Sequence, residues 1–160
     1  MFGLFHKSEE KQLKKDLKKF IKQNLEEEFV GGGRFCKIKL DDFPIEMKKP
    51  FSKTLLDFID SKNMTDVECY KNALIDRKLF SKIRSDMEYK PKKSTVLAFV
   101  ISLKLNLDEA NELLASAGFT LSRSITTDVI IEYFITKKKY DIDLVNEALA
   151  DYKQPLLGSI

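Results

Sequence analysis

One stretch of the sequence restricts the fold more than any other. From residue 96 to residue 103 the side chains are apolar almost without a break: Val96, Leu97, Phe99, Val100, Ile101 and Leu103. A helix with apolar side chains all around it has to be buried on every side, because no part of its surface suits water. The rest of the chain must therefore supply enough further helices to surround this one.

Three helices are predicted before this central helix. They start near residue 51, after the capping box Thr65-x-x-Glu68, and after Asp76, which is expected to cap the third. The second and third are short, and a tight apolar turn at Leu74-Ile75 separates them.

Three helices are also predicted after the central one. They cover residues 108–117, ended by Gly118, and about 126–137 and 141–152. The pattern predicts a mainly α domain over residues 51–160, which is long enough to bury a core without disulfides or metals. No internal repeat is apparent in it.

The first 50 residues are predicted to form an appendage to this domain. Residues 8–29 have the pattern of an amphipathic helix, which Gly31-Gly32-Gly33 ends. Residues 34–40 alternate in the manner of a short β strand, and Lys48-Lys49-Pro50 marks the boundary to the helical domain. The chain therefore divides into an amphipathic helix with a short β segment in residues 1–50 and the helical domain.

The apolar stripe of the N-terminal helix has three possible uses. Its members lie at helical spacing: Leu13, Leu17, Phe20, Ile21 and Leu25. The stripe can pack on the helical domain, pair with a second copy of itself in a homodimer, or lie on an acidic membrane surface. Packing or pairing is the commoner fate, so a membrane is not an expected partner. No apolar run reaches the ~20 residues that a membrane span needs.

Charge is distributed unevenly along the chain. The 28 basic and 25 acidic residues give a formal net charge of +3, which says nothing about partners. Between residues 77 and 93 the basic side chains outnumber Asp86 and Glu88: they are Arg77, Lys78, Lys82, Arg84, Lys90, Lys92 and Lys93. Such a local excess favours an anionic partner, although runs of this kind are often only solvated faces.

Residues 65–85 have the order of a helix-turn-helix, with a short helix, a tight turn and a second helix that points Phe80 and Ile83 inward. With the helices on either side, residues 51–118 resemble the lambda-repressor-like helix-turn-helix family. The resemblance implies a repressor-like helix-turn-helix helical bundle, here with two extra C-terminal helices. In that family the second helix of the motif reads the major groove of DNA.

A second resemblance covers residues 51–158. The segments Asp76-Arg77-Lys78-Leu79-Phe80-Ser81-Lys82-Ile83-Arg84 and Gln154-Pro155-Leu156-Leu157-Gly158 resemble the helical C-terminal module of some bacterial macro-domain proteins. The chain contains no macro domain. The resemblance, the absence of Trp and the predominance of Lys over Arg favour a bacterial or mobile-element origin.

The repressor resemblance implies that five residues face DNA: Asp76, Arg77, Lys78, Ser81 and Lys82. If the basic segment binds DNA, base edges are reached by Arg77, Lys78 and Ser81, and phosphates are neutralised by Lys82, Lys90, Lys92 and Lys93. Tyr70 and Leu74 depart from the family, which has a small residue and a glycine there. Leu79 lies on or near the outer face, where an apolar residue suits a protein partner better than phosphate.

Two functions follow from these patterns. The first is a non-enzymatic regulator that binds double-stranded DNA. The alternative is a protein-protein interaction adaptor that uses the same helices without binding DNA, because a fold does not fix a function.

Catalytic and metal-binding patterns find little support. His6 is the only histidine and lies near the N-terminus, so a nucleophile has no well-placed base. Cys36 and Cys69 cannot make a disulfide framework or a four-ligand zinc site. We therefore expect no enzymatic activity, no cofactor and no metal, and a cytoplasmic location.

Overall fold

The computed structural model describes the backbone of residues 3–26 and 48–158, and the side chains of residues 8–23 and 48–158. These parts of the chain are mainly helical. Their helices are α1 (Gly3–Glu26), α2 (Phe51–Ser61), α3 (Asp66–Asn72), α4 (Arg77–Ser85), α5 (Lys93–Ser102), α6 (Leu107–Ser116), α7 (Thr126–Thr136) and α8 (Ile142–Asp151). The first helix begins at Gly3, earlier than predicted, and the predicted strand over residues 34–40 lies outside the described residues.

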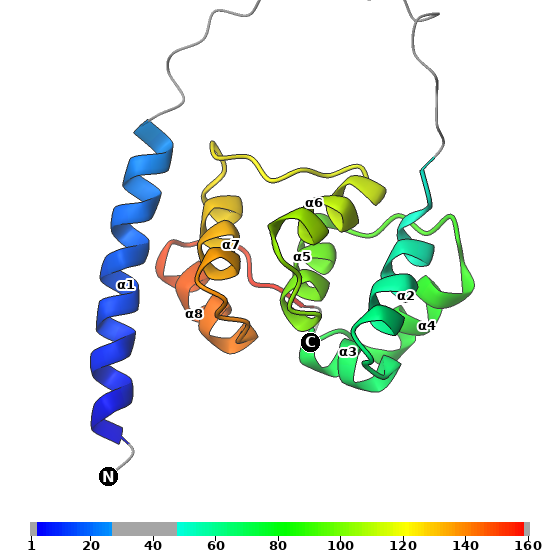
Figure 1. Ribbon diagram of the computed structural model, residues 1–160, viewed down its shortest axis with the longest axis horizontal. Coiled ribbons are helices and arrows are strands. Elements are labelled where there is room, and N and C mark those ends of the chain that lie inside the picture. The colour runs from blue at the N-terminus through cyan, green and yellow to red at the C-terminus, as the bar shows by residue number, and fades with distance from the viewer. Residues whose placement is uncertain (1–2, 27–47, 159–160) are drawn as a thin grey trace, which may run out of the picture.

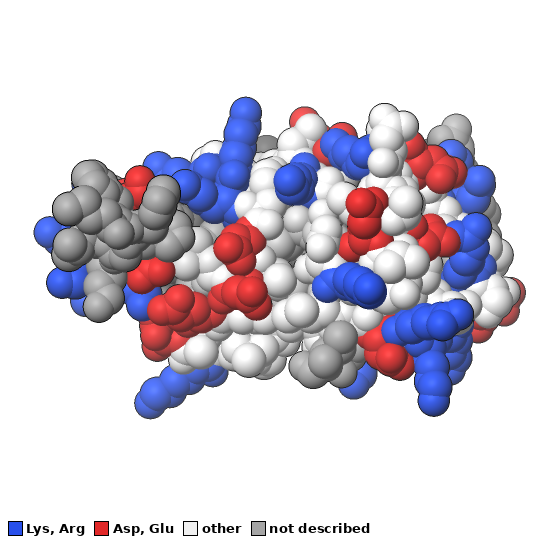
Figure 2. All heavy atoms as spheres, turned by 90° about the horizontal axis from the view of Figure 1, so that it is seen from below, with Lys and Arg blue, Asp and Glu red and all other residues white. Residues whose placement is uncertain are grey.

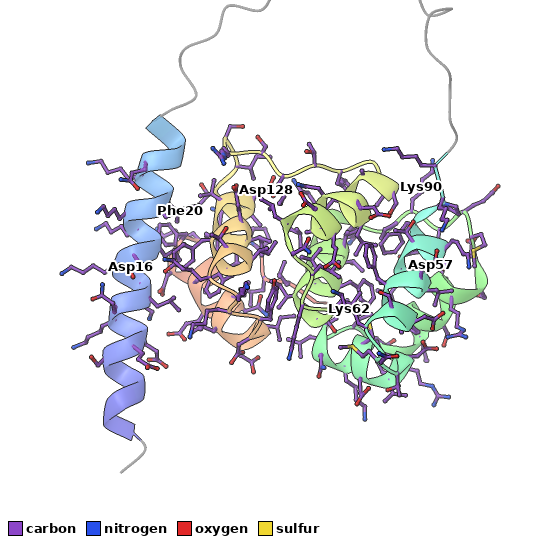
Figure 3. All side chains as sticks on the ribbon, viewed as in Figure 1. Asp16, Phe20, Asp57, Lys62, Lys90 and Asp128 are labelled. Carbon is purple, nitrogen blue, oxygen red and sulfur yellow. The ribbon has the colours of Figure 1, made fainter. Side chains whose placement is uncertain are left out.

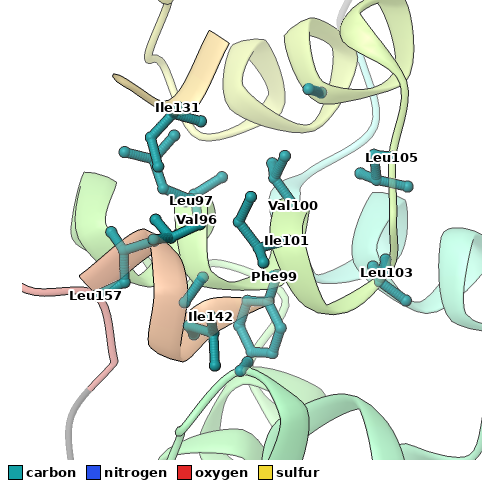
Figure 4. Packing of buried hydrophobic residues seen from close by; sticks show 14 of the residues in the cluster. Val96, Leu97, Phe99, Val100, Ile101, Leu103, Leu105, Ile131, Ile142 and Leu157 are labelled. Carbon is teal, nitrogen blue, oxygen red and sulfur yellow. The ribbon is translucent and has the colours of Figure 1, made fainter. Parts of the chain in front are cut away.

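The apolar stretch of the sequence forms the centre of the molecule, as predicted. Every residue of α5 from Thr95 to Ser102 is buried. This helix packs against α3, α6 and α8 (Figure 1). Its side chains point outward in all directions into the core, and Figure 4 shows Phe99, Val100 and Ile101 doing so.

The other helices lie on two sides of α5 and α6. In Figure 1, α2, α3 and α4 lie on one side and α7 and α8 on the other, with α1 beyond α7. Polar contacts tie the layers together. Lys62, just after α2, donates to the Glu109 carboxylate of α6 at 3.0 Å, and the Tyr140 hydroxyl donates to the Leu105 carbonyl oxygen at 2.8 Å.

Six helices end in the same way. The second residue after each helix has a left-handed backbone: Asn63, Leu74, Lys104, Gly118, Lys138 and Lys153. In each case the N–H of the next residue closes the helix end, as when Ile75 donates to the Tyr70 carbonyl oxygen at 2.9 Å. This is the Schellman motif, which usually has glycine at the left-handed position. Of these six positions only Gly118 is a glycine, so it is the only one at which the sequence signals a left-handed helix end.

The α5–α6 and α7–α8 hairpins repeat one pattern, which corrects the expectation that no repeat is present. Asp108-x-x-Asn111-Glu112-x-Leu114-Ala115 in α6 recurs as Asp143-x-x-Asn146-Glu147-x-Leu149-Ala150 in α8. Both second helices are capped by a side chain, from Asn106 and Asp141 respectively. The second helices of the two hairpins therefore share a short sequence pattern and a side-chain cap at the start.

The amphipathic helix α1 packs on the helical domain, which is the first of its three predicted uses. Leu17 and Ile21 are buried against α7. Phe20 points toward α7 in Figure 3, and its ring meets the Tyr133 ring edge to face at 5.5 Å between centroids. The Tyr133 hydroxyl also donates to the Leu13 carbonyl oxygen at 3.3 Å. The structure thus covers the described part of the stripe, Leu13 to Ile21, which a homodimer through this helix would also use.

None of the helices in the described parts of the chain is long and apolar enough to cross a bilayer.

Candidate nucleic-acid interface

The helix before the turn begins as the sequence predicts. The Glu68 N–H donates to the Thr65 hydroxyl oxygen at 3.2 Å, and the Thr65 N–H donates to the Glu68 carboxylate at 2.9 Å. The two bonds confirm the capping box at the start of α3. The Thr65 N–H, followed by its hydroxyl, holds the pKa of the Glu68 carboxyl below its usual range.

The turn between α3 and α4 is held in a strained backbone conformation. Leu74 has a φ of 54°, in the region that a residue with a side chain rarely adopts. Cys69, Ala73 and Ile75 are all buried beside it and anchor the turn to the core. From α5, the Ser102 hydroxyl donates to the Cys69 carbonyl oxygen at 2.6 Å.

Tyr70 has a structural role in the place of the smaller residue that the resemblance implies. Its ring lies 5.4 Å from the ring of Phe80, between centroids, so it joins α3 to α4. Phe80 in turn packs edge to face on Phe99 of the central helix. The bulky side chain therefore fills the space between the two helices of the motif.

One side of α4 is buried and the other is open. Phe80 and Ile83 point into the core, as predicted. The opposite side presents the residues that we call the α4 face, all of them exposed: Arg77, Lys78, Ser81 and Lys82. Asp76 occupies the N-cap position of this helix, but its side chain makes no capping hydrogen bond, contrary to prediction. Leu79 is partly buried and packs against the core.

The cations of the α4 face are not neutralised by ion pairs with described residues. Arg77, Lys78 and Lys82 make no salt bridge within the described side chains, whereas Arg84 of the same helix pairs with Asp66 of α3. The Lys82 ammonium lies 5.5 Å from the centre of the Tyr89 ring, a cation–π contact. Figure 2 shows basic side chains gathered at the end of the molecule that α2, α3 and α4 form, with carboxylates among them.

The loop that follows α4 separates the remaining predicted residues. Lys90 and Lys92 are exposed between α4 and α5. Lys93 differs, because its ammonium lies 2.5 Å from the carboxylate of Asp128 on α7. The Asp128 side chain is buried (Figure 3) and also accepts the Ser122 N–H at 2.8 Å. The structure therefore pairs the partly exposed Lys93 with a buried carboxylate of α7.

Two residues of this region were missed by sequence reasoning, Asp66 and Asp128. Each removes a cation from the basic segment, by pairing with Arg84 and Lys93 respectively. Asp66 and Asp128 both lie in the first turn of a helix, where an acidic residue is expected from the helix dipole alone. Their pairing with distant cations leaves no signal in the sequence.

No protein-family model, curated protein or solved structure matches the chain. Function has to be argued from the exposed cations, the turn that holds them and the helices that leave them uncovered.

Proposed function

We propose that the protein is a non-enzymatic regulator that binds double-stranded DNA through α3 and α4, used as a repressor-like helix-turn-helix. One observation carries the proposal: the α4 face is exposed, and its cations make no salt bridge with any described residue. The left-handed backbone at Leu74 supports it, because the lambda-repressor-like family that residues 51–118 resemble has glycine here, the residue that adopts this conformation most easily. In the proposed architecture, this helical bundle is preceded by α1 and by the short β segment predicted over residues 34–40.

The proposed contacts divide by chemistry. Arg77, Lys78 and Ser81 lie on the first turns of α4, the part of a recognition helix that reaches base edges in the major groove. Lys82, Lys90 and Lys92 neutralise phosphates. Lys93 does not belong to this set, because its charge is committed to Asp128.

The proposal predicts binding that depends steeply on salt. Each phosphate that a protein cation neutralises contributes about −0.9 to the slope of log affinity against log salt. The Arg77→Ala/Lys78→Ala/Lys82→Ala variant should therefore bind a pool of mixed-sequence duplexes at least about tenfold more weakly at low salt, with a slope shallower by about 1, because Lys82 is the phosphate contact among the three. Fluorescence anisotropy of labelled duplexes at several salt concentrations measures both quantities.

The matched control removes the same charge elsewhere. Lys11, Lys15 and Lys18 are exposed on α1, which packs on α7 and not on α4. We expect Lys11→Ala/Lys15→Ala/Lys18→Ala to weaken binding by less than about threefold. Equal losses in the two variants would show that only net charge matters, and absence of binding by the wild-type protein at low salt would refute the proposal.

The adaptor is the second candidate function, and exposed apolar side chains favour it. Val67 of α3 is 46% exposed and Met87, just after α4, is 42% exposed. Apolar side chains at such positions suit the centre of a protein interface more than a phosphate backbone. If the wild-type protein fails to bind DNA at low salt, these two side chains become the place to test by substitution in a search for a protein partner.

A further inference from the structure

The last described residues run back from α8 to the helix-turn-helix. Residues 154–158, which we call the C-terminal strap, leave α8 in Figure 1 and end at Gly158, against the turn that follows α3. The strap starts at a fixed point, because the Gln154 N–H donates to the Leu149 carbonyl oxygen at 2.8 Å and the Thr127 hydroxyl donates to the Gln154 side chain at 3.0 Å. It is therefore attached to both α7 and α8.

Asn146 of α8 holds the middle of the strap by two hydrogen bonds. The Leu157 N–H donates to the Asn146 side-chain oxygen at 2.7 Å, and the Asn146 amide donates to the Leu157 carbonyl oxygen at 3.2 Å. An amide side chain satisfies the backbone here as a neighbouring strand would. Leu157 is buried and points toward Val96 of α5 in Figure 4, while Leu156 is exposed. The strap thus has a defined inner and outer side.

Gly158 brings the strap so close to the α3–α4 turn that a side chain at this position would not fit. A Cβ atom at this position would lie 2.8 Å from the Leu74 Cβ, 2.9 Å from the Leu74 carbonyl oxygen and 3.2 Å from the Ala73 carbonyl oxygen. The φ of Gly158 is also positive, at 92°. Only glycine permits both the backbone conformation and the approach.

We propose that the C-terminal strap sets the position of α4, and that Asn146 and Gly158 are positioning residues for the α4 face. The strap packs on Leu74, whose strained backbone is the hinge between α3 and α4. A backbone conformation of this kind persists when its surroundings hold it in place. The DNA-binding part of this inference rests on the proposed function, whereas the support of the turn does not.

The first test uses two glycines that differ only in their surroundings. Gly158→Ala and Gly118→Ala both place a side chain at a positive φ, but a Cβ on Gly118 would meet nothing within 4 Å. Amide hydrogen exchange reports on the turn through the Ile75 N–H, with the Leu105 N–H at the equivalent end of α5 as the internal reference. We expect Gly158→Ala to lower protection of Ile75 by at least about tenfold relative to Leu105, and Gly118→Ala to leave that ratio unchanged.

The second test uses the two asparagines of the repeated hairpins. Asn146→Asp keeps the oxygen that accepts the Leu157 N–H and removes the donor to the Leu157 carbonyl oxygen. Asn111→Asp adds the same charge at the matching position of α6, where the side chain is exposed. We expect only Asn146→Asp to lower protection of Ile75. If Gly158→Ala does not fold, the protection of Ile75 in Asn146→Asp still tests whether the strap supports the α3–α4 turn.

DNA affinity completes the test. If α4 is positioned by the strap, Gly158→Ala and Asn146→Asp should bind duplex DNA at least about fivefold more weakly than their controls, although every cation of the α4 face is intact. Ile75 protection equal to that of the controls would overturn the proposal, and so would unchanged affinity with a loosened turn. If the wild-type protein binds no DNA, the proposed function fails, while the exchange of Ile75 still tests whether the strap holds the turn.

Discussion

Lysines of the basic segment differ in role according to their surroundings. Lys92 and Lys93 are neighbours in the sequence, and the sequence predicts the same phosphate contact for both. In the structure Lys92 is exposed, whereas Lys93 pairs with the buried Asp128. A buried carboxylate without its cation is costly, because its charge has lost the hydration of water.

The two lysines should therefore respond to substitution in opposite ways. We expect Lys93→Met to lower the free energy of unfolding by about 2 to 4 kcal/mol, because it leaves the Asp128 carboxylate buried without a cation, and to change DNA affinity by less than about twofold. Lys92→Met should leave stability within about 0.5 kcal/mol and weaken DNA binding. Urea denaturation and duplex titration of both variants check this, and the reverse pattern would return Lys93 to the DNA-binding set.

At the scale of helices, the best predictions came from local sequence. The capping box of α3, the stop at Gly118 and the buried sides of α4 and α5 each depend on residues within one or two turns of one another. The left-handed ends at Lys104 and Lys138 could not be recognised, because lysine gives no signal of such a backbone. The pairing of Lys93 with Asp128 and the approach of Gly158 to Leu74 depend on tertiary packing, so the candidate site was predicted only as a list of cations.

The start of α6 provides a test through pH. Burial, the largest single influence, raises the pKa of the Glu109 carboxyl, but the Asn106 N–H and the Lys62 ammonium together lower it below its usual range. A carboxyl whose pKa is lower in the folded state stabilises the protein above its unfolded pKa, and this stability is lost as pH falls through the folded pKa.

We therefore expect Glu109→Gln to reduce the free energy of unfolding by about 1 kcal/mol at pH 7, and to flatten the loss of stability between about pH 5 and pH 3. Denaturation curves at a series of pH values measure this. Glu112→Gln is the control, since Glu112 is exposed on the same helix and makes no ion pair with a described residue. The same pH dependence in both variants would contradict the assignment.

At the scale of the whole molecule, α1 decides the expected oligomeric state. The described part of its apolar stripe is covered by α7, and Lys14 reaches the Glu147 carboxylate of α8 at 2.9 Å. A homodimer through α1 requires that the helix leave this position or exchange between two chains.

We expect light scattering to give the mass of one chain. Leu17→Asp, which places a carboxylate in the α1–α7 contact, should lower stability by about 2 to 4 kcal/mol without changing that mass. Lys18→Asp is the control, because Lys18 is exposed on the same helix. A wild-type mass of two chains that Leu17→Asp halves would instead support the homodimer.

The position of α1 on the last hairpin suggests a role for this helix that its amphipathic pattern alone does not reveal, namely to cover the outer side of α7. Arrays of stacked helical units leave an apolar face open after the last unit, and such arrays stay soluble only when a terminal cap covers that face. Here α7–α8 is the last unit, and α1, from the other end of the chain, lies on its α7 side with Leu17 and Ile21 inward and its lysines toward water. The N-terminal helix therefore covers the outer side of α7, so a further hairpin packed on that side would require α1 to move.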